Sequence, residues 1–439
     1  MGRQKVSTIA EVWLWDTRIG AVLLPDGEMF ATFEYDPDFL NSGIEVAPLA
    51  MPLSTEVFRF PDLARRSFHG LPGLLADALP DKYGNDLINA WLSTQGRSPT
   101  YFNAVERLCY TGSRGMGALE FRPTTGPAMR ASAPIDIDAL VELASEVLTN
   151  RNDLAVSFAN ADKADALREI LRVGTSAGGA RAKAVIAWNP ATNVVRSGQV
   201  EVPDGFQYWL LKFDGVANNK DHDLADPQGY GAVEYAYSEM AVAAGITMMP
   251  CRLLEENGRR HFMTRRFDRT DDGDKLHMQS LAAMAHYDFN EPGAHSYEQA
   301  FDVMRRLELP ATEIEEQVRR MAFNVIARNQ DDHVKNIAFL MDRNGRWRLS
   351  PAYDVNWAYN PTGDWTSLHQ MSVNGRRDGF DRADLIACAT FAGITQRKVK
   401  SILADVEAAV GKWNRFAEDA QVKSAWIGEI AMSHRSNLA

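Results

Sequence analysis

Residues 321–355 hold the side chains best suited to catalysis; they read MAFNVIARNQDDHVKNIAFLMDRNGRWRLSPAYDV. Asp331 and Asn336 lie in a polar stretch after an expected helix. Asp354 follows an expected hairpin that turns at Asp342–Gly345 and would return the chain to Asn336. Phosphoryl transfer needs a carboxylate that accepts a hydroxyl proton and hard oxygen ligands for magnesium. This stretch therefore predicts magnesium-dependent phosphoryl transfer.

The spacing within the polar stretch suggests a role for each group. Asp331 precedes Asn336 by five positions, as the catalytic aspartate precedes the metal-binding asparagine in the kinase catalytic loop. We predict that Asp331 is the catalytic base and that Asn336 and Asp354 bind magnesium. Asp332 is a rival for the base, and the spacing favours Asp331. Asp-Asp and Asn-Gly pairs are also common turn residues, so an ordinary loop is the alternative interpretation.

The composition limits the class of protein. The chain has 439 residues, of which 45% are hydrophobic and 24% charged, which predicts two or three folded domains. The formal net charge of −11 argues against a protein that binds nucleic acid through its overall charge. The three cysteines are widely spaced, and the sequence shows no signal peptide and no long apolar run. We therefore expect a cytoplasmic protein without a membrane segment.

The N-terminal third combines expected strands with an expected helical segment. Short apolar runs separated by turns over residues 8–35 predict an antiparallel meander. Residues 70–92 change to helical periodicity. The glycine-rich stretch 110–117 has no following lysine or helix, which predicts a tight turn rather than a phosphate loop. Residues 122–136 are rich in proline, serine and threonine, and we place a domain boundary there.

A second glycine-rich stretch, residues 175–183, follows helices expected at 137–149 and 161–172. Its small residues would let backbone N–H groups approach phosphate oxygens, while Arg181 and Lys183 add positive charge. The predicted nucleotide contacts in this stretch are Ser176, Ala177, Gly178, Gly179, Ala180, Arg181 and Lys183. A strand is expected next, so the stretch is not a Walker loop but is similar to the loop that covers the phosphates in protein kinases. A flexible hairpin tip is the alternative.

Lys212 lies inside the apolar strand expected at residues 208–213. A lysine in such a strand is costly unless it faces a counter-charge. Protein kinases place a lysine of this kind opposite the nucleotide phosphates and a helix glutamate. The helix expected at 232–244 offers Glu234 and Glu239, and we count Glu234 among the nucleotide-site residues. An edge-strand lysine that faces water is the alternative.

The segment Arg266–Asp268 follows a hairpin around Asn257-Gly258 and is expected to leave the small lobe. The backbone of Arg266, Phe267 and Asp268 would offer groups to adenine, and Asp268 is the candidate to hold the ribose. His333 and Lys335 complete the predicted nucleotide contacts. From residue 278 onward the pattern is largely helical, at 297–307, 311–328, 383–392, 396–416 and 419–431.

In this order, the motifs resemble those of the HipA family of bacterial toxin-like serine/threonine kinases. The strongest are NQDDHVKN at 329–336 and PAYDV at 351–355. The others are the stretch 175–183, the strand with Lys212 and Arg266–Arg269, while Leu74–Asp81 and Gly117–Leu119 resemble the family's N-terminal subdomain. Ala182 stands where many members have proline, and Val355 where leucine or isoleucine is common; both departures are mild.

The resemblance implies an α+β, two-lobed kinase-like fold that uses ATP and Mg²⁺. It implies an N-terminal subdomain at 1–130, a small lobe at 131–272 and a helical large lobe at 273–439. Lys212 corresponds to the family's phosphate-binding lysine. Ser176 corresponds to its autophosphorylated loop serine, whose modification ejects the loop and switches the enzyme off.

The resemblance also implies partners. Members of the family phosphorylate aminoacyl-tRNA synthetases and are neutralised by a small helix-turn-helix antitoxin that binds DNA. We therefore expect a protein substrate of that class and DNA contact only through the antitoxin. Two alternatives stay open: an ATP-binding pseudokinase or co-repressor that acts by binding an antitoxin, and a small-molecule kinase of the aminoglycoside or sugar type.

Overall fold

The structure is a computed structural model. It describes residues 7–94, 96–125, 135–149, 181–199, 202–216, 220–221, 224–225, 227–436 and 438. The expected helix at 161–172 and the loop residues 176–180 lie outside these described residues.

An antiparallel sheet of four strands begins the fold, in the order β3-β2-β1-β4. Its strands are β1 (Thr8–Leu14), β2 (Thr17–Leu24), β3 (Thr32–Tyr35) and β4 (Leu119–Arg122). In β1, Ala10, Val12 and Leu14 are buried, and the residues between them are partly or fully exposed, because successive side chains of a strand point to opposite faces. The meander predicted over residues 8–35 is confirmed.

The helical stretch predicted at 70–92 forms two helices, α2 (Gly73–Ala76) and α3 (Lys82–Thr94). They are separate because Pro80 lacks a backbone N–H and disfavours helical geometry in the residue before it. The remaining helices of this part are η1 (Phe39–Ser42), α1 (Arg65–Phe68), η2 (Pro99–Tyr101) and α4 (Ala104–Thr111). The tight turn predicted up to residue 117 leads into β4 without a further helix.

The small lobe contains an antiparallel sheet of five strands in the order β10-β11-β7-β5-β6. Its strands are β5 (Lys183–Trp188), β6 (Val195–Ser197), β7 (Gln207–Lys212), β10 (Cys251–Glu256) and β11 (Arg259–Arg265). Helix α5 (Ile137–Thr149) and α3 share an apolar cluster with β5 and β7, while α8 (Tyr230–Ala243) packs on β10 and β11. Strands β8 (Lys220–Asp221) and β9 (Leu224–Ala225) pair in an antiparallel manner.

The large lobe is mainly helical. Its helices are α9 (Leu281–Ala285), α10 (Tyr297–Arg306), α11 (Ala311–Ile326), η3 (Val334–Asn336), α12 (Arg382–Phe391), α13 (Gln396–Val410), α14 (Trp413–Asp419) and α15 (Ser424–Ser433). The helix predicted at 396–416 is interrupted at Gly411, and the helix predicted at 419–431 begins later, at Ser424.

Two small sheets cross the large lobe. They are formed by β12 (His277–Ser280), β14 (Ala338–Met341) and β15 (Trp347–Leu349), and by β13 (His295–Ser296) with β16 (Met371–Ser372). The strand β12, which the largely helical pattern from residue 278 did not predict, pairs with β14. The expected hairpin at 337–349 is present as β14 and β15.

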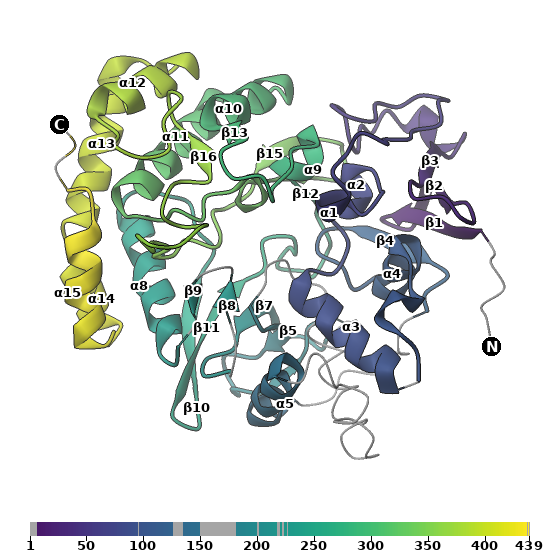
Figure 1. Ribbon diagram of the computed structural model, residues 1–439, viewed down its shortest axis with the longest axis horizontal. Coiled ribbons are helices and arrows are strands. Elements are labelled where there is room, and N and C mark those ends of the chain that lie inside the picture. The colour runs from purple at the N-terminus through teal and green to yellow at the C-terminus, as the bar shows by residue number, and fades with distance from the viewer. Residues whose placement is uncertain are drawn as a thin grey trace.

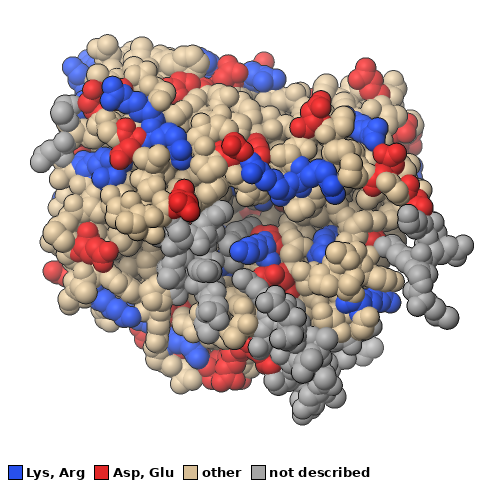
Figure 2. Space-filling model, in the orientation of Figure 1, with Lys and Arg blue, Asp and Glu red and all other residues tan. Residues whose placement is uncertain are grey.

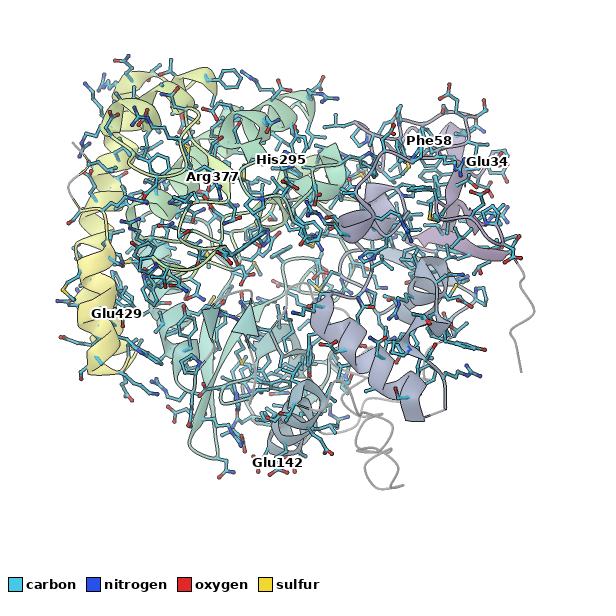
Figure 3. All side chains as sticks on the ribbon, viewed as in Figure 1. Glu34, Phe58, Glu142, His295, Arg377 and Glu429 are labelled. Carbon is cyan, nitrogen blue, oxygen red and sulfur yellow. The ribbon has the colours of Figure 1, made fainter. Side chains whose placement is uncertain are left out.

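In Figure 1 the N-terminal sheet lies at the right of the view, and helices of the same part lie next to the lobes: α2 packs against α9 of the large lobe and α3 against α5 of the small lobe. The exposed residues Glu142 on α5 and Glu429 on α15 lie at the periphery of the view in Figure 3. Basic and acidic side chains are mixed over the face in Figure 2. No helix in the described part of the chain combines the length and the apolar character that a membrane span requires. The predicted α+β, two-lobed architecture with an N-terminal β-rich part is confirmed.

Polar contacts fix the N-terminal part to the large lobe. Both carboxylate oxygens of Asp77 accept hydrogen bonds from Ser280, one from its main-chain N at 2.7 Å and one from its Oγ at 2.8 Å. The main-chain N of Gly73 donates to His286 Nε2 at 3.0 Å. A Cβ on Gly73 would lie 2.4 Å from the main-chain O of Ala283, so only glycine permits this close approach.

We expect Asp77→Ala to lower the free energy of unfolding by about 2–4 kcal/mol, because it leaves two buried polar groups of Ser280 without their acceptor. Urea denaturation measures this change. Asp62→Ala, at an exposed residue of the same part, is the control and should change the value by less than about 0.5 kcal/mol. Equal effects of the two substitutions would contradict the role of Asp77.

Candidate active site

The polar stretch after α11 adopts a turn held by one of its own side chains. The helix ends at Ile326, and Arg328 takes a left-handed φ of 58° that redirects the chain. The side-chain Nδ2 of Asn336 donates to the main-chain O of Asp331 at 2.8 Å. This bond fixes the five-residue spacing in space and leaves the amide oxygen of Asn336 for a ligand.

The two neighbouring aspartates have different surroundings. Asp332 is 3% exposed, and its Oδ2 accepts from Tyr297 Oη and His369 Nδ1, each at 2.8 Å. Its Oδ1 accepts from the main-chain N of Gln370 at 2.8 Å. Burial raises the pKa of Asp332, but these donors, with His369 foremost, bring it below its ordinary value. Asp331 keeps 20% of its side chain exposed, so the geometry favours Asp331 as the group that can meet a substrate.

Trp365 contacts Asp331, although nothing in the sequence singled it out. Its indole Nε1 donates to Asp331 Oδ1 at 2.6 Å, and the residue is 9% exposed. His333 Nε2 lies 3.8 Å from the same oxygen. A hydrogen bond to one carboxylate oxygen orients the group and directs the other oxygen elsewhere. A single tryptophan in a loop carries no periodicity or motif, so only the fold reveals this contact.

Lys212 lies between two carboxylates at the end of β7. Its Nζ is 2.6 Å from Glu234 Oε1 on α8 and 2.5 Å from Asp354 Oδ1. Of the two partners considered for Lys212, Glu234 forms the ion pair, while Glu239 is exposed on α8. A strand lysine paired with a helix glutamate is the arrangement by which kinases hold the nucleotide phosphates.

The charges in this cluster affect one another strongly. Burial lowers the pKa of Lys212, but Asp354 and Glu234 raise it by more, so its net pKa lies above the ordinary value. Burial raises the pKa of Asp354, but the surrounding cations, Lys212 foremost, hold it well below its usual range. At Glu234 burial prevails and the pKa is raised. Asp354 is therefore ionised and suited to a cation.

The two predicted magnesium ligands lie on chain segments that are bonded to each other. Tyr353, which precedes Asp354, donates from Oη to the main-chain O of Lys335 at 2.5 Å, and Lys335 precedes Asn336. Asp354 has a left-handed φ of 56° and a side chain that is 38% exposed. An ionised carboxylate and an amide oxygen are hard ligands, so they fit magnesium. Among the described residues no three His, Cys, Asp or Glu side chains gather around a metal position.

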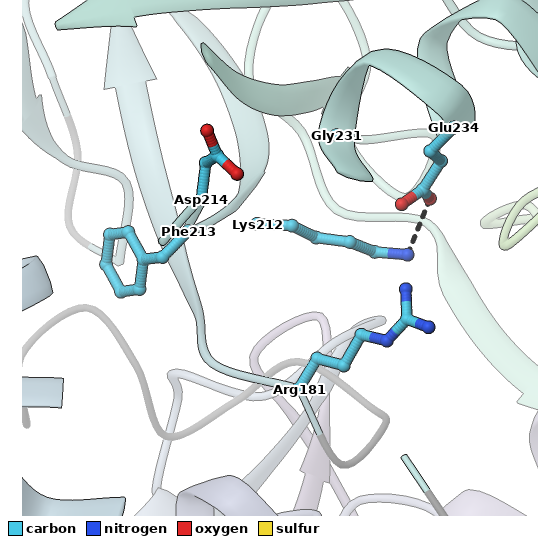
Figure 4. A pocket seen from close by; sticks show the side chains of 6 residues that line it. All are labelled: Arg181, Lys212, Phe213, Asp214, Gly231 and Glu234. Atoms are coloured by element: carbon cyan, nitrogen blue, oxygen red, sulfur yellow. Dashed lines mark hydrogen bonds and ion pairs between the residues drawn. The ribbon is translucent and has the colours of Figure 1, made fainter. Parts of the chain in front are cut away.

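Arg181 and Lys183 lie at the start of β5 and face different partners. Figure 4 shows Arg181 and Lys212 directed toward the side of the pocket where Glu234 lies. The residues that line this small pocket are Arg181, Lys212, Phe213, Asp214, Gly231 and Glu234. Lys183 is 2% exposed, and its Nζ lies 3.3 Å from Asp81 Oδ2 of the N-terminal part. Burial raises the pKa of Asp81 to about 6 even though Lys183 opposes it.

The segment Arg266–Asp268 differs in part from its prediction. Asp268 is completely buried, and its carboxylate accepts from Arg266 at 2.8 and 2.6 Å and from the main-chain N of Gly117 at 2.7 Å. Arg269 donates to it as well, at 2.7 Å. The ribose role predicted for Asp268 does not fit this geometry, because its oxygens are bonded within the protein. Phe267 is half-buried, and its ring centroid lies 5.4 Å from that of Tyr353.

The remaining predicted contacts lie beside the catalytic stretch. The main-chain N of Lys335 donates to His333 Nδ1 at 3.2 Å, and Lys335 Nζ lies 4.6 Å from the ring centroid of Phe289. The structure thus gathers Asp331, Asn336, Asp354, Lys212 and Glu234 through direct bonds and neighbouring residues. The loop residues 176–180 lie outside the described part.

Comparison with known proteins identifies a curated relative and a solved structure that are similar to this chain. Among curated proteins, the chain is 26% identical over 212 residues to the putative kinase Y4mE of Sinorhizobium fredii (strain NBRC 101917 / NGR234). That alignment covers 44% of this chain and 49% of Y4mE, so it spans about half of that relative.

A solved structure covers almost the entire chain. It belongs to the Shewanella oneidensis MR-1 toxin–antitoxin complex of HipA, HipB and operator DNA. The TM-score is 0.66 at 16% identity, over 96% of this chain and 95% of that one, which establishes a common fold. The profile of the HipA-like C-terminal domain matches residues 175–413, and that of the HipA N-terminal domain matches residues 10–122. The two matched segments include most of the sequence, and the chain therefore belongs to the HipA family.

Proposed function

We propose that this protein is an ATP- and magnesium-dependent serine/threonine protein kinase and the toxin of a toxin–antitoxin pair. The observation that carries this proposal is the position of Lys212, whose ammonium contacts both Glu234 and Asp354. Asp331 and Asn336 lie on a loop that is bonded to the segment before Asp354. A phosphate-binding lysine, a base and two metal ligands are the parts that phosphoryl transfer requires.

In the proposed reaction each side chain has one task. Asp331 accepts the hydrogen bond of the substrate hydroxyl and takes its proton as the hydroxyl oxygen attacks the γ-phosphorus, while the bond from the γ-phosphorus to the β,γ-bridging oxygen breaks and ADP leaves. Lys212 binds the phosphates, and its bond to Asp354 yields when nucleotide enters, which frees a carboxylate oxygen. Asn336 and Asp354 would hold magnesium, which neutralises charge on the phosphates when bound. The adenine would lie beside Phe267.

The substrate and partner are proposed at the level of class. The fold neighbour from Shewanella is solved with HipB and operator DNA, which supports a small DNA-binding helix-turn-helix antitoxin as the partner here. The net charge of −11 favours DNA contact through that partner. The family resemblance supports an aminoacyl-tRNA synthetase as the substrate and Ser176 as the autophosphorylated residue.

A second candidate is a binding protein that acts with an antitoxin as co-repressor without phosphoryl transfer. The solved complex with operator DNA is the observation in its favour. The presence of Asp331, Asn336, Asp354 and Lys212 favours the kinase. The two functions are compatible, and transfer of radiolabelled phosphate separates a kinase from a pure co-repressor.

Asp331→Asn should reduce phosphoryl transfer by roughly 10²–10⁴-fold, the usual contribution of a general base. Its melting temperature and nucleotide affinity should stay unchanged, because Asp331 is partly exposed and contributes little to packing. Transfer of radiolabelled phosphate from ATP to protein in a lysate measures the effect.

The neighbouring substitution Asp332→Asn is the matched control. It disturbs a buried carboxylate that accepts three hydrogen bonds, so we expect a loss of stability of about 2–4 kcal/mol. Undiminished labelling by Asp331→Asn would exclude Asp331 as the base.

Trp365→Phe should lower kcat about tenfold and leave the KM for ATP unchanged. The substitution removes only the indole N–H that orients Asp331, and one charge-assisted hydrogen bond is worth about 1.5–3 kcal/mol. Trp347→Phe is the control. It also removes an indole N–H, but that group donates to the main-chain O of Glu45 and not to Asp331. A kcat that is equal in Trp365→Phe and wild type would show that the contact has no part in transfer.

A further inference from the structure

A largely buried arginine beyond α15 contacts the end of the helix that leads into the catalytic stretch. The side chain of Arg435 is 10% exposed. Its main-chain N donates to the O of Ile326 at 2.9 Å, and its Nη1 donates to the O of Val325 at 2.7 Å. Both acceptors belong to the last turn of α11, whose carbonyls have no partner within the helix. Arg435 therefore caps α11, and its positive charge suits the C-terminal end of a helix.

Arg435 also reaches the catalytic stretch through a histidine. Its Nη1 lies 2.9 Å from Nε2 of His369, which is completely buried. A guanidinium can only donate, so His369 Nε2 accepts and the ring carries its proton on Nδ1. That proton is donated to Asp332 at 2.8 Å. One side chain, that of His369, thus connects Arg435 to Asp332, the residue next to Asp331.

A second branch reaches the stretch through Gln330. The Oε1 of this buried residue accepts from Arg328 Nη1 at 2.8 Å and from Arg435 Nη2 at 3.4 Å. Asp378 is the shared counter-ion of both arginines. Two cations near one carboxylate are costly to desolvate, and burial lowers the pKa of Arg435 accordingly.

The bonds alternate along the catalytic stretch. Gln330 and Asp332 bond to the network of Arg435, whereas Asp331 between them bonds to Trp365. The network therefore holds the stretch through the two residues that flank Asp331.

We propose that Arg435 is a positioning residue for phosphoryl transfer, which acts through His369 and Asp332 to hold the loop that presents Asp331. This inference rests on the proposed function. Without Arg435, His369 Nε2 and the carbonyls at the end of α11 lose their donor, and the loop can move while the nucleotide cluster around Lys212 stays intact.

The test compares three variants of the full chain. Arg435→Gln removes the cation and most of its donors, and Arg435→Lys keeps the cation. Arg415→Gln is the matched control, because Arg415 on α14 is 78% exposed and pairs only at the surface with Asp419. For each variant we would measure kcat, the stoichiometry and Kd of ATP binding, and amide hydrogen exchange of peptides that cover residues 328–333.

Arg435→Gln should lower kcat about tenfold or more and speed exchange at residues 328–333. The variant should still bind one ATP molecule per chain, with a Kd within about threefold of wild type, because the cluster around Lys212 stays intact. A variant that is merely destabilised would instead lose ATP-binding sites in proportion to its loss of kcat. Arg435→Lys should recover part of the kcat, and Arg415→Gln should match wild type.

The route through His369 has its own test. His369→Asn keeps an N–H near the position of Nδ1, which donates to Asp332, but it removes the acceptor for Arg435. Because the two residues act in series, the kcat of the double variant Arg435→Gln/His369→Asn should be little lower than that of the less active single variant. Losses that multiply would overturn the proposed route.

If Arg435→Gln keeps the wild-type kcat and the wild-type rate of amide hydrogen exchange at residues 328–333, the positioning role is overturned. A loss of kcat matched by an equal loss of ATP-binding stoichiometry would overturn it too, since it shows a role in folding alone. If the wild-type protein transfers no phosphate, the proposed function fails, and exchange at residues 328–333 still decides whether Arg435 holds the loop.

Discussion

The ammonium of Lys212, held between Glu234 and Asp354, is the contact on which the site depends. A largely buried charge is tolerated only where its partners are fixed at hydrogen-bonding distance. One partner lies on α8 and the other on the loop after β15, so these two contacts require the small-lobe sheet, a helix and a large-lobe loop to meet at Lys212. Asp214 contributes to this by accepting from the main-chain N of Gly229, just before α8, at 2.6 Å.

The second constraint is that the adjacent residues Asp331 and Asp332 differ in burial and in hydrogen-bond partners. Asp332 is held from inside the large lobe by buried donors, and Asp331 is turned toward the exposed side and held by Trp365. The side chain of Asn336 donates a hydrogen bond to the main-chain O of Asp331, and Tyr353, which precedes Asp354, donates one to the main-chain O of Lys335. These contacts come from α10, the loop before β16 and the residues after α15, so several segments of the large lobe hold the stretch that contains Asp331.

The sequence predicted the parts of the site that are local in the chain. The five-residue spacing from Asp331 to Asn336, the hairpin that returns Asp354 and the lysine within β7 all follow from short-range patterns. Periodicity also located α5 and α11 to within two residues. These features depend on turn chemistry and on the spacing of apolar residues, which a single sequence contains.

What the sequence did not predict depends on contacts between distant segments. The burial of Asp268 requires the backbone of Gly117, and the orientation of Asp331 requires Trp365 from a loop without regular structure. The capping of α11 by Arg435 joins residues 110 positions apart. No local pattern marks such pairs, and the interruption of the predicted helix at Gly411 likewise shows that periodicity can continue through a break in structure.

The magnesium dependence of ATP binding is the sharpest test of the proposed site, because the carboxylate oxygen of Asp354 that Lys212 releases when nucleotide enters would then hold magnesium. Calorimetry of ATP binding with and without magnesium, in wild type and in Asp354→Asn, separates the two contributions. We expect magnesium to tighten ATP binding to the wild-type protein by about tenfold or more and to have little effect on Asp354→Asn. An equal effect of magnesium on both proteins would contradict it.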